Sequence, residues 1–237
     1  MPVVAPNASR GFFVTGTDTG VGKTRVACAL LRALVRSGVR AVGMKPVAAG
    51  ALHDAEGLLN EDVAALNTAS TFVAPRALVN PYCFEPAIAP HIAAARAGVV
   101  IELARIASAF EALALQADTV VVEGAGGFCI PLGDAFDSAD LAERLGLPVI
   151  LVVGLRLGCL SHALLTAQAI RARGLTLAGW IANRIDPAME AVDENVSALA
   201  GRLGAPLLAE LRHVPGGLFE LALEQLDIAV QGVSFRG

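Results

Sequence analysis

Residues 11–24 of the chain are Gly-Phe-Phe-Val-Thr-Gly-Thr-Asp-Thr-Gly-Val-Gly-Lys-Thr. The apolar run at 12–14 predicts a buried strand, and the glycine-rich turn after it predicts a loop that opens a helix at Lys23. Glycines allow the backbone N–H groups of such a loop to point into one concavity, and the start of the next helix adds a positive partial charge. This strand, loop and helix together predict a site for a polyphosphate.

The loop is one residue longer than the common phosphate-binding pattern. Five residues separate Gly16 from Gly22, where the common pattern has one fewer. We expect Lys23 to contact the β- and γ-phosphates of a nucleotide and the Thr24 hydroxyl to ligate Mg²⁺.

The length fits one large α/β domain or two small ones, and the composition is that of a folded protein. The 237 residues are 55% hydrophobic and 17% charged, which excludes a disordered chain. A net charge of −4, without a long basic run, argues against nucleic acid and anionic membranes as partners.

Scattered cysteines predict small buried side chains in a reducing compartment: Cys28, Cys83, Cys129 and Cys159. No charged-then-apolar leader opens the sequence and the longest apolar run, 147–155, is short, so we expect a soluble cytoplasmic protein.

Strands and helices alternate along the rest of the chain. We expect strands at 40–47, 118–123, 148–154, 177–183 and 206–211, and helices at 23–37, 62–66, 92–97, 101–116, 137–145, 161–173 and 188–203. Residues 48–61 are expected to form a polar loop, and the proline-rich stretch 75–90 an irregular excursion. The alternation predicts a single domain over 1–237 with a doubly wound, mostly parallel sheet, preceded by a loose tail at 1–10.

Polar residues stand at the carboxyl ends of three expected strands: Lys45, Glu123 and Asn183. Ligands bind at these ends in doubly wound sheets, so we expect the three side chains to converge on the glycine loop. Glu123 is placed either to ligate Mg²⁺ or to cap a turn. Lys45 either meets an anion or reaches the surface. The histidines lack metal-ligand spacing. An Mg-nucleotide enzyme and a nucleotide switch both remain open.

Several motifs resemble those of the dethiobiotin synthetase family of biotin biosynthesis. They are Phe-Val-Thr-Gly-Thr-Asp-Thr-x-Val-Gly-Lys-Thr (13–24), Lys-Pro-Val-Ala (45–48), Asn-x-Asp (60–62), Val-Asn-Pro-Tyr (79–82), Pro-His-Ile (90–92), Val-Glu-Gly-Ala-Gly-Gly (122–127) and Ala-Gly-Trp-Ile-Ala-Asn (178–183). The resemblance implies a P-loop NTPase fold of the nitrogenase iron-protein branch. It also implies that diaminopelargonate, CO₂ and ATP are converted to dethiobiotin, ADP and phosphate.

The resemblance also implies roles for individual residues. Lys45, Lys23 and Thr19 would be catalytic, while Thr24, Asp62 and Glu123 would hold Mg²⁺. ATP would bind at Gly20, Val21, Gly22, Lys23, Thr24, Arg25, Asp62, Glu123, Gly124, Ala125, Gly126, Asn183, Arg184, Arg212, His213 and Val214. Substrate would bind at Thr19, Lys45, Ala49, Gly158, Cys159, Leu160 and Ser161, the last four lying at a helix start near the interface of a homodimer.

The chain departs from the family pattern at three places. Gly20 stands where an acidic residue is common, Ala49 where a serine often touches substrate, and the segment 212–237 diverges. Two alternatives to the synthetase remain. One is a relative that transfers ammonia to cobyrinate-like acids, although 237 residues leave no room for its glutaminase domain. The other is a nucleotide switch; members of that branch carry an extra lysine early in the loop, where this chain has Asp18.

Overall fold

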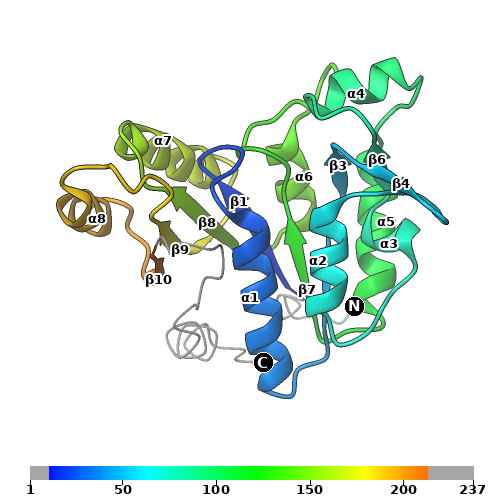
Figure 1. Ribbon diagram of the computed structural model, residues 1–237, viewed down its shortest axis with the longest axis horizontal. Coiled ribbons are helices and arrows are strands. Elements are labelled where there is room, and N and C mark those ends of the chain that lie inside the picture. Colours follow the sequence, from blue (N-terminus) through cyan, green and yellow to red (C-terminus); the bar gives the residue numbers. More distant parts are fainter. Residues whose placement is uncertain (1–10, 213–237) are drawn as a thin grey trace, which may run out of the picture.

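The computed structural model describes residues 11–212, and a six-stranded sheet lies at their centre (Figure 1). Its strands are β1 (Gly11–Gly16), β2 (Ala41–Met44), β7 (Thr119–Glu123), β8 (Val149–Gly154), β9 (Leu177–Asn183) and β10 (Leu207–Leu211). They are ordered β10-β9-β8-β1-β7-β2, and every neighbouring pair is parallel. The expected parallel sheet is confirmed, and its carboxyl ends share one edge.

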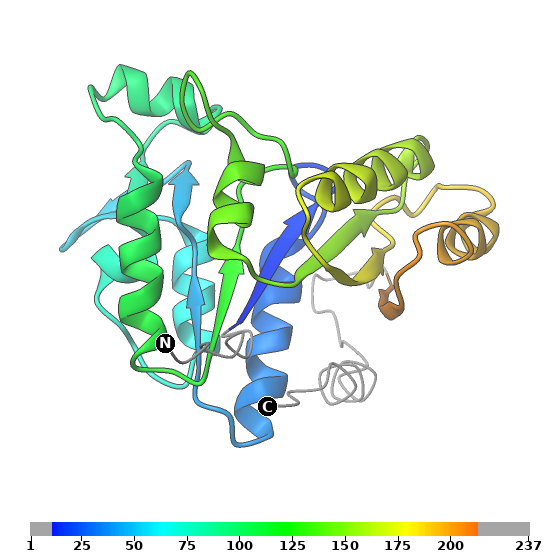
Figure 2. The ribbon, with the colours of Figure 1, turned by 180° about the vertical axis from the view of Figure 1, so that it is seen from behind.

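Helices pack on both faces of the sheet. The helices of residues 11–212 are α1 (Lys23–Arg36), α2 (Glu61–Ala69), α3 (Arg76–Val79), α4 (Pro90–Arg96), α5 (Leu103–Ala114), α6 (Ser138–Leu145), α7 (Cys159–Ala172) and α8 (Val192–Ala200). Helices α1 and α2 lie over one face (Figure 1), and α5, α6 and α7 lie over the other (Figure 2). Phe12 and Val14 therefore pack into the core on the α1 side, and Phe13 into the core on the opposite side. Burial of both faces explains why β1 is apolar at successive positions.

Local sequence accounts for the helices that hold the site. In α1, Val26, Leu30 and Leu34 are fully buried and recur at helical spacing. The helix ends before Gly38, whose φ of +80° is a conformation that glycine adopts without strain. In α6, the side chain of Asp137 accepts hydrogen bonds from the first turn and completes a capping box.

The expected strand at 40–47 is two strands in different sheets. Strand β2 ends at Met44, and β3 (Val47–Ala49) pairs in parallel with β6 (Tyr82–Phe84) in a separate two-stranded sheet. The break falls at Lys45-Pro46. Proline has no N–H to donate, and the N–H of Lys45 donates to the carbonyl of Val79 at 2.8 Å instead of continuing the main sheet. The break leaves Lys45 just beyond the sheet edge.

Two expected irregular stretches contain regular structure, so these expectations were wrong. Within 48–61, β4 (Leu52–Asp54) and β5 (Gly57–Leu59) form an antiparallel hairpin, whose turn Asp54 stabilises by accepting from the N–H of Glu56 at 2.8 Å. Within 75–90, the structure contains α3 and β6. These strands have three residues each, too few for alternation of polar and apolar residues to mark them.

Smaller differences concern helix starts and one cysteine. Helix α7 begins at Cys159 instead of 161. Helix α8 begins at Val192 instead of 188, because Asp186 first accepts from the N–H of Ala188 in a turn. Cys129 is exposed, contrary to the expectation that the cysteines are buried.

Within residues 11–212, no helix is long and apolar enough to cross a membrane. The segments 1–10 and 213–237 lie outside the described residues, so the single domain over 1–237 stays a prediction.

Candidate active site

A cavity of about 1030 Å³ opens at the carboxyl ends of β1, β2, β7 and β9. Such a volume is large enough for a nucleotide and a second small molecule. Most of the residues singled out from sequence line it, namely Thr19, Gly20, Gly22, Lys23, Thr24, Arg25, Lys45, Ala49, Asp62, Glu123, Ala125, Gly126 and Asn183. Parallel strands end at one edge, which explains why these distant residues meet.

The glycine loop forms one wall of the cavity. Gly20 and Gly22 have φ of +74° and +96°, which other residues rarely adopt. The Lys23 ammonium donates to the carbonyl of Asp18 at 2.9 Å across the loop. Burial, together with the positive charge of Lys45, lowers the pKa of Lys23 to about 8. A phosphate that enters the loop would therefore pair with a poorly solvated lysine ammonium, and its negative charge would stabilise that ammonium.

Asn183 supports the loop from β9. Its amide Nδ2 donates to the carbonyl of Val21 at 2.8 Å. A Cβ at Gly22 would come within 2.5 Å of that nitrogen, so the close approach requires glycine there. The Oδ1 atom of Asn183 is buried and has no hydrogen-bond partner in the protein. Asn183 therefore holds the loop with one end of its amide and offers an acceptor with the other.

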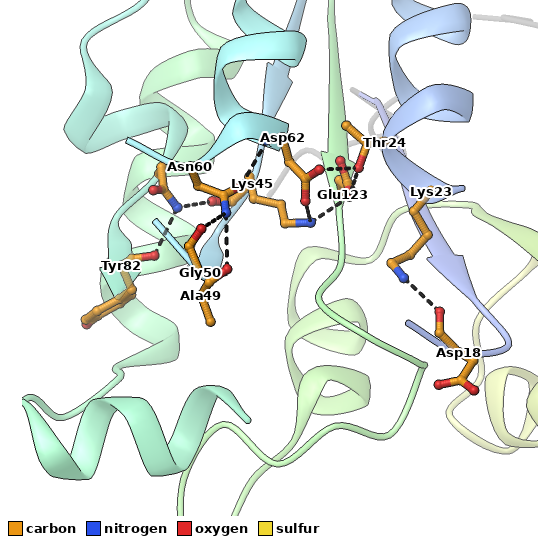
Figure 3. A network of polar contacts seen from close by, with 11 residues as sticks. Asp18, Lys23, Thr24, Lys45, Ala49, Gly50, Asn60, Asp62, Tyr82 and Glu123 are labelled. Carbon is orange, nitrogen blue, oxygen red and sulfur yellow. Dashed lines mark hydrogen bonds and ion pairs between the residues drawn. The ribbon is translucent and has the colours of Figure 1, made fainter. Parts of the chain in front are cut away.

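A polar cluster of Lys45, Asp62, Glu123 and Thr24 lies beside the loop (Figure 3). The Lys45 ammonium is 2.8 Å from Asp62 Oδ2 and 2.6 Å from Glu123 Oε1. The Thr24 hydroxyl is 2.7 Å from Asp62 Oδ1 and 2.8 Å from Glu123 Oε1. Asp62 and Glu123 lie 61 residues apart in the chain, yet both contact the same lysine and the same hydroxyl.

Burial and the charges of the neighbouring groups shift the pKa values of this cluster in opposite directions. Burial lowers the pKa of Lys45, but the carboxylates of Glu123 and Asp62 outweigh it and hold the pKa above its ordinary value. Burial raises the pKa of Glu123, and the charge of Lys45 only partly offsets this effect. Burial also acts to raise the pKa of Asp62, but the charge and hydrogen bond of Lys45, with help from Thr24 and Lys23, outweigh it and lower that pKa. The sequence-based expectation that Lys45 meets an anion is met within the protein itself.

The donor set suits a magnesium ion. Thr24, Asp62 and Glu123 supply hydroxyl and carboxylate oxygens, the ligands that Mg²⁺ prefers. The second carboxylate oxygen of Glu123, Oε2, is buried without a hydrogen-bond partner. Among residues 11–212, no three His, Cys, Asp or Glu side chains gather into a metal cluster, so the candidate set depends on the threonine hydroxyl.

Other residues expected at the site lie away from the cavity. Val21, within the loop, is buried, and a Cβ at Gly124 would lie 3.3 Å from the ring of Phe13. The side chain of Arg184 forms ion pairs with Asp193 and Glu210. The remainder are outside the lining, namely Gly158, Cys159, Leu160, Ser161 and Arg212. His213 and Val214 fall outside the described residues.

The structure adds an apolar wall that the sequence did not reveal. It is formed by Val47, Ala48, Ala87, Ile88, Ala89, Pro90, Ile130 and Ile185. Part of this wall belongs to the proline-rich stretch 75–90. The prolines in that stretch were the available sequence signal that its backbone is rigid. Asn60 and Asn80, both buried, hold this side of the site through backbone contacts.

Comparisons with known proteins identify the family of this chain. A family model described as an AAA domain matches residues 10–216. The ATP-dependent dethiobiotin synthetase BioD of Aromatoleum aromaticum is 63% identical over 207 residues, which are 87% of this chain and 92% of that protein. The protein of the same name from Nitrosospira multiformis is 54% identical, over 95% of this chain and 98% of that one.

Solved structures share the fold at low identity. A ParA family ATPase from Chlorobium tepidum aligns with a TM-score of 0.54 and 16% identity, over 97% of this chain and 95% of that one. The septum site-determining protein MinD of Pyrococcus horikoshii, complexed with Mg-ADP, aligns with a TM-score of 0.53 and 18% identity, over 95% and 90%. The solved structures show the fold, the sequence relatives show the family, and the chain belongs to the ATP-dependent dethiobiotin synthetase family.

Proposed function

We propose that this chain converts diaminopelargonate, CO₂ and ATP to dethiobiotin, ADP and phosphate. Its family relatives carry the name of this activity. One structural observation carries the proposal. A second lysine, Lys45, lies in the same cavity as the phosphate loop and its Lys23. Phosphate binding by the loop needs one lysine, and the other is available for a second anion formed from the substrate.

The chemistry proceeds through two intermediates. One amine of diaminopelargonate attacks CO₂, forms a C–N bond and loses a proton to give a carbamate. A carbamate oxygen then attacks the γ-phosphorus of ATP, and ADP leaves, which gives a carbamic–phosphoric anhydride. The second amine attacks the carbamoyl carbon. The ureido ring closes as the bond from that carbon to the phosphate oxygen breaks, and phosphate and a proton are released.

The residues of the cavity meet the needs of these steps. The carbamate, the transferred phosphoryl group and the mixed anhydride are all anionic, so the rate depends on positioning and on positive charge placed in advance. We assign Lys23 to the transferred phosphoryl group, Lys45 to the carbamate, and Thr19 to a contact beside them. All three line the cavity. No covalent nucleophile is required.

Magnesium would be held by Thr24, Asp62 and Glu123. The unpaired Oε2 of Glu123 and the convergence of three oxygen-bearing side chains support this assignment. When bound, the ion would neutralise charge on the phosphates of ATP. Lys45 donates to the same two carboxylates, so its ammonium and the ion would share them.

Base recognition is assigned to Asn183. Its Nδ2 is occupied by Val21, which leaves Oδ1 as an acceptor for the exocyclic amino group of adenine. Around the phosphates, the backbones of Gly22 and Gly126 line the cavity.

We further propose a homodimer that works in the cytoplasm, where ATP is available. Leu157, before α7, is 94% exposed, and Leu165 within α7 is 60% exposed. Burial of such side chains against a second copy would be favourable. The start of α7, at Gly158–Ser161, would then face substrate bound in the partner's cavity.

The test is phosphate release from purified protein with MgATP and bicarbonate, with and without diaminopelargonate. We expect release that depends on diaminopelargonate and matches dethiobiotin measured by mass spectrometry. Phosphate release that does not depend on diaminopelargonate, with no dethiobiotin formed, would contradict the proposal and favour a nucleotide switch. A Lys23→Met variant provides the blank for contaminating phosphatase, since it lacks the lysine of the loop.

A further inference from the structure

Asn60 belongs to the sequence motif Asn-x-Asp, yet the chemistry above uses only Asp62. Its side chain is 5% exposed and lies between two parts of the site. The amide Nδ2 donates to the carbonyl of Ala49 at 3.1 Å and to that of Gly50 at 3.4 Å. The amide Oδ1 accepts from the N–H of Asp62 at 3.0 Å. Both ends of one buried amide are therefore occupied by different segments (Figure 3).

These contacts close a ring of linked segments beside the cavity. Asp62 holds the ammonium of Lys45, and Lys45 begins the segment that ends at Ala49 and Gly50. Asn60 joins the end of that segment back to Asp62. The distance between the lysine and the cavity wall at Ala49 thus depends on Asn60 as well as on the backbone between them.

Asn60 also caps helix α2, which by itself would be an ordinary structural role. Capping requires only the acceptor Oδ1. The donor Nδ2 contributes nothing to the helix, and its two acceptors lie on the segment that forms the cavity wall. The separate use of the donor points to a second role.

We propose that Asn60 is a positioning residue that fixes the 45–50 segment relative to Asp62, so that Lys45 and the wall at Ala49 meet diaminopelargonate together. This role rests on the proposed function, because Asn60 acts on substrate only through these neighbours. Strand β3 is also held by β6, so loss of Asn60 displaces the end of the segment without unfolding the sheet.

The test separates the two ends of the amide. Asn60→Ser retains an acceptor that caps α2 and loses the donor. We expect its KM for diaminopelargonate to rise about tenfold, the size expected from losing two hydrogen bonds of ordinary strength. Calorimetric binding of MgADP should stay close to wild type, and the melting temperature should fall by less than in Asn60→Ala, because the cap of α2 is kept. Asn60→Asp also keeps the cap but turns a carboxylate toward two carbonyls, so its KM should rise at least as much. In Asn60→Ala, the cap is lost too, and MgADP binding and the melting temperature should both fall.

Asn195→Ser is the matched control. It removes an amide-to-carbonyl bond of 2.7 Å, to Ala191, on a helix that does not line the cavity. Its KM should equal that of wild type. If wild type makes dethiobiotin and the folded Ser or Asp variant of Asn60 keeps the wild-type KM, the positioning role is overturned and only the cap remains. If wild type makes no dethiobiotin, the proposed function itself fails.

Discussion

Lys45 is a buried cation whose two anionic partners come from elsewhere in the chain. Both its carboxylate contacts are within 2.8 Å, and 5% of the residue is exposed. A charge held in this way is available to a reacting anion without waiting for water to reorganise.

Replacement of Lys45 should affect turnover more than nucleotide binding. Lys45→Ala should lower kcat by at least about a hundredfold, the scale of losing one charge placed for the transition state. The affinity for ADP, measured by calorimetry, should be largely retained, since the loop and Lys23 remain. The control is Arg173→Ala, which removes an ion-paired cation between α6 and α7. A Lys45→Ala enzyme as active as wild type would remove Lys45 from the mechanism.

Glu123 should govern the requirement for magnesium. Glu123→Gln removes one charged oxygen ligand, so the half-saturating Mg²⁺ concentration should rise at least about tenfold. Calorimetric titrations with ADP at fixed Mg²⁺ concentrations measure the weaker Mg²⁺ binding independently of catalytic turnover. Glu61→Gln is the matched control, because Glu61 is an exposed carboxylate that also lines the cavity. Coincident Mg²⁺ titrations for Glu123→Gln and wild type would exclude Glu123 as a ligand.

Lys23 should make nucleotide binding depend on pH. Its pKa of about 8 in the protein lies below the ordinary 10.5, so the ammonium is lost as pH rises through 8. Phosphates bind the ammonium. ADP binding without Mg²⁺ should therefore take up a proton above pH 8 and weaken by up to about tenfold per pH unit, while staying level below pH 8. Calorimetry at pH 7 and 9 in buffers of different ionisation enthalpy measures the uptake. Equal proton uptake by wild type and Lys23→Met at pH 9 would contradict this assignment.

At the scale of elements, short contacts determine where helices begin. Asp137 accepts from the N–H groups of Ala139 and Asp140 at 2.7 and 3.0 Å, while Asp140 accepts in return from the N–H of Asp137. The sequence-based helix at 137–145 is confirmed within one residue because this capping pattern is local. Where a start depends on a turn formed first, as at Asp186 before α8, the sequence prediction was four residues early.

Loss of the α6 cap should reduce stability. Asp137→Ala should lower the free energy of unfolding by about 1 kcal/mol, since two N–H groups lose their acceptor. Asp137→Ser should recover most of the loss, because a serine also caps. Urea unfolding followed by circular dichroism measures both. Equal stability of the Ala and Ser variants would show that the cap contributes nothing.

At the scale of the whole molecule, the sheet assembles the site, and exposed leucines lie on and before α7. The P-loop stands on β1 in the middle of the sheet, with Glu123 on neighbouring β7 and Asn183 on β9. The apolar side chains on and before α7 lie outside this site. A substitution there therefore tests assembly without touching the nucleotide pocket.

Leu157→Asp should dissociate the proposed homodimer. A charge buried at the interface of two copies is unfavourable. Sedimentation equilibrium should show a dimer for wild type and a monomer for the variant, whose KM for diaminopelargonate should rise while ADP affinity stays unchanged. Val100→Asp is the control, because Val100 is 77% exposed and lies near α4. A monomeric wild type with full activity would contradict the dimer.

The sequence by itself determined the parallel sheet, the glycine loop and the helices with continuous apolar stripes. These depend on contiguous patterns, such as a strand followed by glycines and Gly22-Lys23-Thr24. It also predicted which strand ends carry Lys45, Glu123 and Asn183, since a parallel sheet brings its carboxyl ends together.

Only the tertiary structure decided what these side chains contact. The pairing of Lys45 with Asp62 and Glu123, and the ring closed by Asn60, join residues from separate elements. The strands β3 to β6 are too short for a sequence period, and the apolar wall at 87–90 comes from a proline-rich segment without one. Such contacts depend on how elements pack in space, and spacing along the chain carries no record of that packing.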